Sequence, residues 1–171
     1  GPAVTVREES GPFGTFRSED FKVGAMIDAA GAGDVIVVAV DGVPYSTWGG
    51  MASLAAATKG VAGIAVDGGA RDADETVDAG FNVFTRHLVP TTGRCRLNIA
   101  EIGGTVVVDG VTVSSGDWVV ADDTGILAIP AGIVERVIEL SEAFTLEDEQ
   151  AANAIREGLS FSEAMKKFGN I

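Results

Sequence analysis

The sequence predicts an α/β fold, and three observations support this prediction. Apolar residues make up 46% of the 171 residues and aromatic residues only 6%, so we expect a core of Val, Ala and Ile. Apolar runs at 34–40 and 61–66 flank a stretch that reads as a helix, which is typical of a βαβ unit. The 23 glycines favour short elements joined by tight turns. The length is sufficient for one domain with a sizeable core.

The first half of the chain should alternate between strands and helices. Alternating apolar residues indicate a strand, Gly and Pro indicate loops, and Asp20 is a residue type that begins helices. In chain order we expect a strand at 3–7, a loop at 8–19, a helix from Asp20 to Gly31, a strand at 34–40, a turn at 41–45, a helix from 48–51 to about 57, a strand at 61–66, a short helix at 74–78 and a strand at 81–84.

The second half should contain two hairpins followed by helices. Asp109-Gly110, a favoured two-residue hairpin turn, joins runs at 105–108 and 111–113. A second hairpin is expected from the runs at 118–121 and 126–129, joined by residues 122–125. Three helices are then expected: one after Pro130 with Ile133, Val137 and Leu140 on one face, one from Thr145 to Gly158, and one opened by the capping box Ser160-x-x-Glu163.

This order predicts an α/β domain over residues 1–143 and a C-terminal helical tail over residues 144–171. The tail is too polar to form a core alone, so we expect it to pack on the same domain or on a neighbouring subunit. The chain enters a strand directly after Gly1-Pro2, which suggests that sequence precedes it.

Charge and composition argue against several classes of protein. The net charge of −13 disfavours direct binding to nucleic acid, because a polyanion needs a basic patch. No apolar run approaches the roughly 20 residues that span a membrane. A single cysteine, Cys95, excludes an internal disulfide and fits a reducing compartment. With no leader-like start, we expect a cytoplasmic protein.

The strongest chemical signal is Arg71-Asp72, which follows the apolar run at 61–66. Open α/β sheets bind ligands at the carboxyl ends of their strands. A guanidinium can hold a carboxylate with two hydrogen bonds, and a neighbouring Asp can hold a hard divalent cation. An anion clamp beside a cation suits a substrate with adjacent carboxylate and carbonyl groups, that is, a 2-oxo acid. Most Arg-Asp pairs are solvated surface charges, which is the alternative.

A second signal, Gly49-Gly50, lies just before a helix. Free backbone N–H groups at a helix start can bind an anion, although a glycine pair can also be simple turn chemistry. Because βαβ strands run parallel, this helix start and Arg71-Asp72 should lie at the same sheet edge. We expect the backbone of residues 50–52, Arg71 and Asp72 to converge there.

The spacing of these two signals matches a known sequence pattern. In that pattern twenty residues separate a glycine from an Arg-Asp pair, and two residues separate the pair from an acidic residue. Gly50, Arg71, Asp72 and Glu75 meet it. The other matching segments are Gly1 to Val6, Gly33 to Val38, Gly63-x-x-Val66-Asp67-Gly68 and Gly116-Asp117-x-Val119-x-Ala121-Asp122-Asp123-x-Gly125. The chain thus resembles, over nearly its whole length, the family of the regulator of ribonuclease activity A (RraA-like) and the 4-hydroxy-4-methyl-2-oxoglutarate aldolases.

The resemblance implies a swivelling β/β/α fold and homotrimers, or hexamers built from them, with the active site at a subunit interface. For the aldolase branch it implies a lyase in which Mg²⁺ or Mn²⁺ is held by Asp72, mostly through waters. Arg71 would be catalytic with Asp72, and Gly49, Gly50, Met51 and Ala52 would bind the substrate with Arg71. Cleavage would release pyruvate, and oxaloacetate decarboxylation would be a side activity.

The resemblance also leaves two functions open. The aldolases carry an acid where this chain has Gly50, and the glycine form occurs in the ribonuclease-regulator branch. The acidic tail is more similar to the aldolases, which supply a Glu from a neighbouring subunit; Glu147 or Glu149 could match it. A metal-dependent lyase on 2-oxo acids is the first hypothesis. A non-enzymatic regulator that binds another protein is the second.

Six other residues have a chemical and a structural interpretation. They are Glu75 (a hydrogen bond to metal-bound water or Arg71, or a helix-start charge), Asp122 with Asp123 (metal ligands, or a turn), His87 (a general base, or packing), Trp48 (a pocket wall, or core) and Tyr45 (a substrate hydrogen bond, or an exposed loop).

Overall fold

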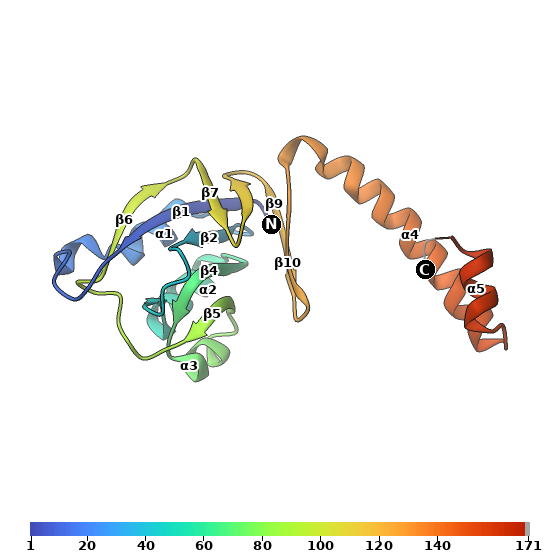
Figure 1. Ribbon diagram of the computed structural model, residues 1–171, viewed down its shortest axis with the longest axis horizontal. Helices are drawn as coiled ribbons and strands as arrows, with labels where there is room; N and C mark the ends of the chain where they lie inside the picture. The colour runs from blue at the N-terminus through green and yellow to red at the C-terminus, as the bar shows by residue number, and fades with distance from the viewer. Residues whose placement is uncertain (170–171) are drawn as a thin grey trace. The chain divides into compact units, whose positions relative to one another are not determined.

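The structure is a computed structural model that describes residues 1–169 and divides the chain into two compact units, Gly1–Pro130 and Ala131–Ile171. Figure 1 shows the course of the chain through both units. Among the helices of the described residues, none combines the length and hydrophobicity that a membrane crossing requires.

The first unit is built on a six-stranded sheet. Its strands are β1 Ala3–Ser10, β2 Val35–Ala39, β3 Ser46–Trp48, β4 Gly63–Ala70, β5 Asn82–Leu88 and β6 Leu97–Ile102. The path through the sheet is β3-β4-β2-β1-β6, and β5 pairs with the other edge of β4. All pairs are parallel except β1 with β6. The central parallel pairs confirm the predicted βαβ arrangement.

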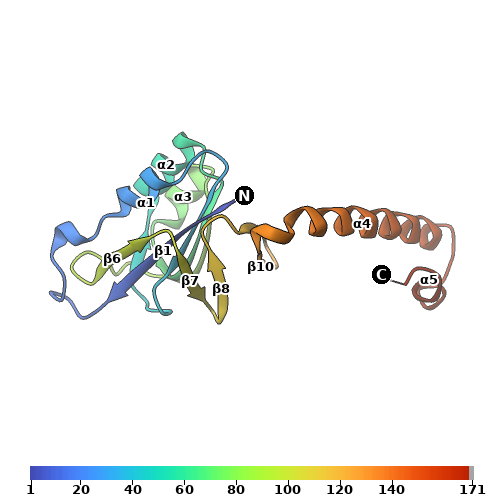
Figure 2. The ribbon, with the colours of Figure 1, turned by 90° about the horizontal axis from the view of Figure 1, so that it is seen from above.

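One face of the sheet is covered by helices. These are α1 Val23–Ala29, α2 Gly50–Lys59 and α3 Ala73–Asp78, which lie together in Figure 2, preceded by the 3-10 helix η1 Ser18–Asp20. The core on this face contains Ile36 and Val38 of β2, Met26 of α1 and Ala56 of α2. Trp48 lies in the same core and stacks on Phe81 with ring centroids 5.7 Å apart.

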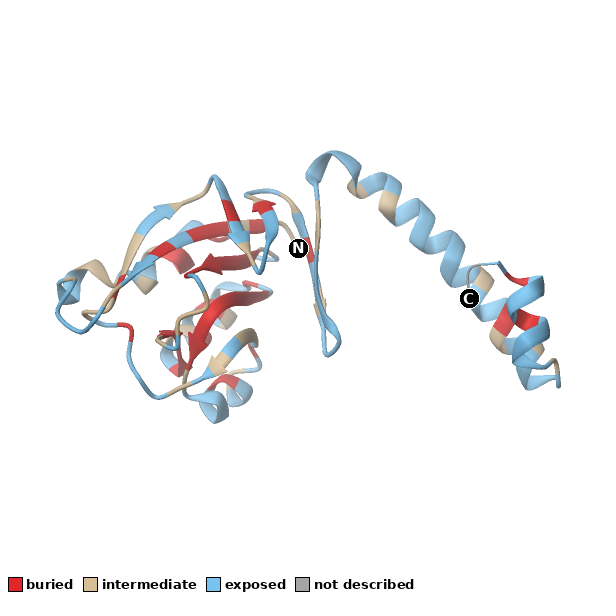
Figure 3. Cartoon of the chain, viewed as in Figure 1, coloured by how far each residue is buried: buried red, intermediate tan, exposed pale blue. Residues whose placement is uncertain are grey.

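The other face of the sheet is covered by the two predicted hairpins, β7 Thr105–Val108 with β8 Val111–Ser114 and β9 Trp118–Asp122 with β10 Gly125–Ile129. Val35 and Val37 of β2 pack there against Val106, Val113 and Val119. All five residues of β2 are buried, as expected for a strand covered on both faces, and β2 and β4 stand out as buried in Figure 3. The layers form a β/β/α fold, in agreement with the expected fold class.

The second unit is helical. It contains the 3-10 helix η2 Ala131–Ile133, the long helix α4 Val134–Arg156 and the short helix α5 Phe161–Lys167. Ala151 of α4 packs against Ala164 and Phe168 in a small core. The predicted capping box is present, since Ser160 and Glu163 exchange hydrogen bonds at the start of α5.

Several predicted boundaries were wrong. The helix α1 starts after Lys22, because the Asp20 carboxylate accepts a hydrogen bond from the Arg17 amide and does not cap α1. No helix starts at Thr145, since α4 runs through this position and Thr145 donates to the Ser141 carbonyl within the helix. The first unit ends at Pro130, and the expected boundary at 143/144 lies inside α4.

Three strand predictions also needed correction. β1 extends to Ser10 because β6, which was not predicted, pairs with it. β4 extends to Ala70, and its last residues pair with β3, which was predicted as a turn and helix start. β3 lies on the β2 side of β4, beyond the point where β2 ends. Short strands formed by tertiary pairing carry little local signal.

Candidate functional site

Arg71 is held at the carboxyl end of β4 by the short strand β3. Its backbone amide donates to the Trp48 carbonyl at 3.0 Å. Its Nη1 donates to the Ser46 hydroxyl at 3.2 Å. Ser46 is fully buried and donates to the Trp48 carbonyl in turn, so the guanidinium rests on a fixed support. The arginine directly follows the strand, as predicted, and its side chain remains one-third exposed.

Asp72 has an unusual backbone for its position. It precedes α3 with φ 55°, in the left-handed region that costs free energy for a residue other than Gly. Its carboxylate does not cap α3, although Asp favours that role. Instead Oδ2 accepts from the Gly50 amide at 3.2 Å and lies 3.3 Å from Arg71 Nε. The conformation therefore turns the carboxylate toward the start of α2.

The start of α2 is packed closely against this turn, so a side chain at Gly49 would crowd Arg71 and Asp72. A Cβ on Gly49 would lie 2.7 Å from Asp72 Oδ2 and 3.1 Å from Arg71 Cγ. Ser53 helps to hold the backbone at Gly49 in place. Its hydroxyl donates to the Gly49 carbonyl at 3.1 Å and accepts from the Trp48 indole N–H at 2.9 Å. The predicted convergence of Gly49, Gly50, Arg71 and Asp72 is present.

Glu75 occupies the space beside Gly50. A Cβ on Gly50 would lie 2.0 Å from Glu75 Oε2 and 2.6 Å from Glu75 Cβ. Since the second contact involves the base of the side chain, a rotamer change of Glu75 would not relieve it. The carboxylates of Asp72 and Glu75 therefore both border Gly50, where the resemblance places an acid in the aldolases.

A cavity of about 390 Å³ opens over this constellation. It is lined by Gly49, Met51, Ala52, Arg71 and Asp72 from the site, and by Thr47, residues of the segment 21–27, Ala55 and Arg94. Met51 is highly exposed at the start of α2. The volume is sufficient for a small organic acid.

The donor set fits a hard divalent cation that keeps most of its waters. Among the described residues, no group of three or more His, Cys, Asp and Glu side chains could enclose a metal ion. Mg²⁺ is commonly held by one or two carboxylates together with waters and substrate oxygens. Asp72, with 38% of its side chain exposed and Glu75 nearby, offers such a site.

Comparison with known proteins shows the family to which the chain belongs. The family model described as RraA-like, Aldolase/RraA, matches residues 1–128, well over half of the chain. The chain belongs to the RraA-like family. The motifs that carry the resemblance in the sequence thus identify the family correctly.

Relatives of this RraA-like protein differ in what their names say. An uncharacterized protein of Methanocaldococcus jannaschii is 30% identical, over 96% of this chain and 76% of its own length. A Halalkalibacterium halodurans protein, provisionally named as a 4-hydroxy-4-methyl-2-oxoglutarate aldolase, is 30% identical over 93% of this chain and 72% of its own. A solved structure from Streptomyces coelicolor, described as an unusual member of the RNase ES inhibitor RraA protein family, has a TM-score of 0.75 at 27% identity, covering 91% of this chain and 77% of its own.

The remaining predicted residues of the RraA-like protein lie outside the constellation. Trp48 is fully buried in the core, and it does not line the cavity. Tyr45 lies under the Arg96 guanidinium, 5.5 Å from the ring centroid. The His87 ring contacts the Gly42 carbonyl at 3.0 Å. Asp122 shapes the β9–β10 turn by accepting from the Thr124 hydroxyl and from the Thr124 amide at 2.8 Å. These bonds, that of the hydroxyl first, lower the pKa of Asp122.

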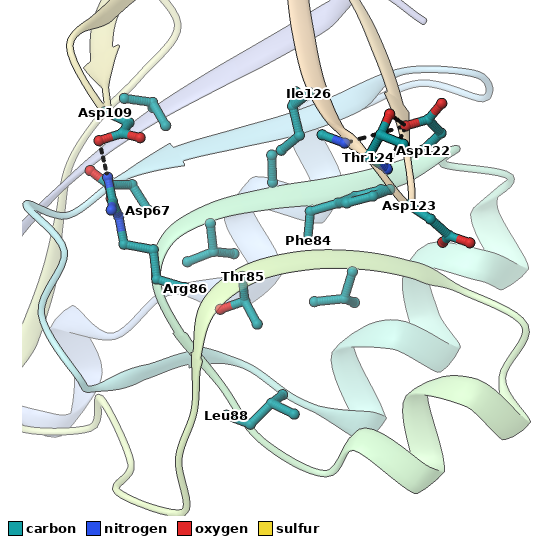
Figure 4. A pocket seen from close by; sticks show the side chains of 15 residues that line it. Asp67, Phe84, Thr85, Arg86, Leu88, Asp109, Asp122, Asp123, Thr124 and Ile126 are labelled. Atoms are coloured by element: carbon teal, nitrogen blue, oxygen red, sulfur yellow. Dashed lines mark hydrogen bonds and ion pairs between the residues drawn. The ribbon is translucent and has the colours of Figure 1, made fainter.

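A second cavity, of about 570 Å³, lies between β4, β5 and the β9–β10 turn (Figure 4). Its lining includes the carboxylates of Asp122 and Asp123, and Arg86, which binds both Asp67 and Asp109. The carboxylates of Asp109 and Asp67 raise the pKa of Arg86 further above its usual range. Arg86 is already paired with two carboxylates. It is therefore less available than Arg71 to bind a substrate anion.

Sequence reasoning missed the residues that support the site. Ser46 and Ser53 hold Arg71 and Gly49, and Thr47 donates to the buried Glu8 at 2.6 Å. Ser46 and Thr47 carried no signal, because β3 was read as a turn. Glu8, in contrast, had a signal in the sequence. It follows Val4 and Val6 at the spacing that places side chains on one face of a strand.

Proposed function

We propose that the protein is a divalent-metal-dependent lyase that cleaves a carbon–carbon bond in 2-oxo acids. Its substrates would be 4-hydroxy-4-methyl-2-oxoglutarate or 4-carboxy-4-hydroxy-2-oxoadipate, each releasing pyruvate, with oxaloacetate decarboxylation as a related activity. One observation carries the proposal: the Arg71 guanidinium and the Gly50 amide both lie within 3.3 Å of the same Asp72 oxygen, at the mouth of a cavity.

Each group has a separate task in this proposal. Arg71, fixed by Ser46, binds the substrate carboxylate and orients the 2-oxo group, and its charge stabilises the enolate that bond cleavage leaves. The backbone at Gly50, Met51 and Ala52 contributes N–H groups from the start of α2. Asp72 would hold Mg²⁺ or Mn²⁺, which when bound supplies a Lewis acid for the keto oxygen.

The subunit arrangement belongs to the same proposal. We expect a homotrimer, or a hexamer built from trimers, in which the cavity of one subunit is completed by a neighbour. The aldolase resemblance assigns that contribution to an acidic tail residue such as Glu147 or Glu149.

A specific observation favours the second candidate, a non-enzymatic regulator that binds another protein. Position 50 is Gly, and Glu75 fills the space that a longer side chain would need. The Streptomyces coelicolor neighbour is described as a member of an inhibitor family. The acidic surface of this chain could then attract a basic segment of a partner.

Pyruvate release separates the two candidates. Purified protein is given each of the three substrates with Mg²⁺ or Mn²⁺, with and without a chelator, next to the Asp72→Asn and Asp78→Asn variants. Chelator-sensitive release that Asp72→Asn abolishes and Asp78→Asn preserves supports the lyase. If wild type with either metal releases no pyruvate from any substrate, the lyase proposal is wrong and the regulator is favoured.

A further inference from the structure

A buried carboxyl group with no assigned role lies behind the candidate site. Glu8 follows Val4 and Val6 on β1, and strand alternation places all three on the sheet face that packs into the helix-covered core. Glu8 is only 4% exposed. An ionised carboxylate at such a position is costly unless it is well paired.

The pairing of Glu8 is incomplete. Its Oε2 accepts from the Thr47 hydroxyl at 2.6 Å, while its Oε1 is buried without a hydrogen-bond partner among the described residues. Burial raises the pKa of Glu8 to about 7, and the Thr47 bond opposes this only in part. Near neutral pH the protonated and the ionised forms of Glu8 are therefore both populated.

Thr47 connects this carboxyl group to the site. It stands between Ser46 and Trp48, the two residues that hold Arg71, and it lines the 390 Å³ cavity together with Arg71 and Asp72. Because both partners are O–H groups when Glu8 is protonated, the bond can reverse and leave the Thr47 proton free for the cavity. The Glu8–Thr47 pair thus reaches from the core to the cavity that the proposed substrate would occupy.

We propose that Glu8 is a positioning residue which, through Thr47, provides the proton that converts the pyruvate enolate into pyruvate. This inference rests on the proposed lyase function. The Thr47 hydroxyl gives its proton to the enolate carbon, forming a C–H bond, as it takes the proton of Glu8. Glu8 is left ionised and recovers a proton from water before the next turnover, so one proton is consumed at this carbon and no other reactant is required.

The charged groups on the surrounding elements are not among the causes of the shift in the pKa of Glu8. Arg7 pairs with Glu9 and Glu101 at exposed positions of β1 and β6. Asp41 lines a cavity together with Glu8, and the cavity beside Thr47 is lined by the ionisable residues Lys22, Arg71, Asp72 and Arg94. The shift in the pKa of Glu8 has burial and the Thr47 bond as its causes.

The pH dependence of kcat for pyruvate release from oxaloacetate tests this path. For wild type, kcat should fall as the pH rises through about 7, since the protonated form of Glu8 is lost. Glu8→Gln and Thr47→Val should lower kcat by about 10-fold or more, leave KM within about twofold, and remove this pH limb. Thr47→Ser keeps the hydroxyl and should therefore keep both kcat and the decline of kcat above about pH 7. Glu9→Gln, a change at an exposed position, should behave as wild type.

The outcomes separate this inference from the proposed function. No pyruvate from wild type at any pH contradicts the lyase and this step with it. An active wild type whose pH profile persists in Glu8→Gln or Thr47→Val overturns the proton path alone. Carboxyl-carbon NMR of wild type gives an answer even if a variant fails to fold: a Glu resonance titrating near pH 7 is expected, and ionisation of every Glu at about pH 5.5 contradicts the proposal.

Discussion

Arg71 is the residue on which the proposed chemistry depends most directly. Its guanidinium has one fixed neighbour, the Ser46 hydroxyl, and a second N–H group toward Asp72, so its direction is set before substrate arrives. Arg71→Ala should lower kcat/KM for pyruvate release by at least about 100-fold, the loss typical of removing a charged stabilising donor. Arg71→Lys should recover little, because an ammonium cannot reproduce the two-pronged contact. Circular dichroism would check that both variants fold, and full activity of Arg71→Ala would contradict the assignment.

Glu8 allows a prediction about stability that does not depend on any enzymatic activity. Its pKa is raised to about 7 in the folded protein from an ordinary value of 4.5. Between these two values the unfolded chain releases the proton while the folded protein retains it, so rising pH lowers the free energy of unfolding. Above about pH 7 the effect is complete.

The Glu8→Gln variant isolates this contribution. Relative to wild type, it should gain about 2 kcal/mol in the free energy of unfolding between about pH 5.5 and pH 8, since one pKa unit corresponds to about 1.4 kcal/mol. Urea unfolding at both pH values measures the difference, with Glu9→Gln as the exposed control. Equal pH dependence in wild type and Glu8→Gln would show that Glu8 does not titrate in this range.

At the scale of elements, the contact between α2 and α3 determines which residues the site can contain. Gly50→Ala should cost about 1–3 kcal/mol in the free energy of unfolding, the usual range for overpacking, because its Cβ would contact Glu75 Cβ. Glu75→Gly should relieve this cost in the double variant, apart from about 1 kcal/mol for a helical glycine. Gly24→Ala in α1 is the matched control, since its Cβ would meet nothing within 4 Å. A Gly50→Ala variant as stable as Gly24→Ala would mean that the helices are not in this contact.

The elements also show what sequence could and could not predict. β2 and the hairpins around Asp109-Gly110 and Asp122 were predicted, because a continuous apolar run and a two-residue turn are local signals. β3 and β6 were missed, because each is defined by pairing with a distant partner.

The same distinction applies to the site. Arg71-Asp72 and Gly49-Gly50 were found, because helix starts and strand ends are visible in a sequence. The turn of the Asp72 carboxylate toward Gly50 and the proximity of Glu75 depend on how α2 packs on α3, and no local pattern encodes that packing.

Within the first unit, Arg86 connects two strands through a buried charge. Asp67 has 7% of its side chain exposed and binds Arg86, whereas Asp109, also bound to Arg86, has 79% exposed. Arg86→Met would leave the Asp67 carboxylate buried without a cation and should lower the melting temperature. Asp109→Ala should change it little, since exposed pairs contribute little. Calorimetric melting of both variants gives the comparison, and equal losses would show that burial of Asp67 does not matter.

At the scale of the whole molecule, the exposed apolar residues of α4 bear on the assembly. Leu140 and Phe144 of α4, and Ile133 of η2 directly before it, are each more than one-third exposed, and with Val137 they recur at helical spacing along one face. Such a face favours association, so we expect trimers or hexamers by light scattering after gel filtration. Leu140→Ser with Phe144→Ser should shift the protein toward monomers, and Glu142→Ser should not. A monomeric wild type would contradict this expectation.

Oxalate is a planar dicarboxylate that resembles the enolate of pyruvate. Its binding tests most directly whether Arg71 and a metal ion held by Asp72 bind a 2-oxo acid together. Calorimetric titrations would compare wild type, Arg71→Ala and Asp72→Asn, each with Mg²⁺ and with a chelator. We predict that wild type binds oxalate only with Mg²⁺, and that each substitution weakens binding by about 100-fold, equivalent to about 2.7 kcal/mol. Binding of equal strength in all three proteins, or binding that persists with the chelator, would contradict the proposed site.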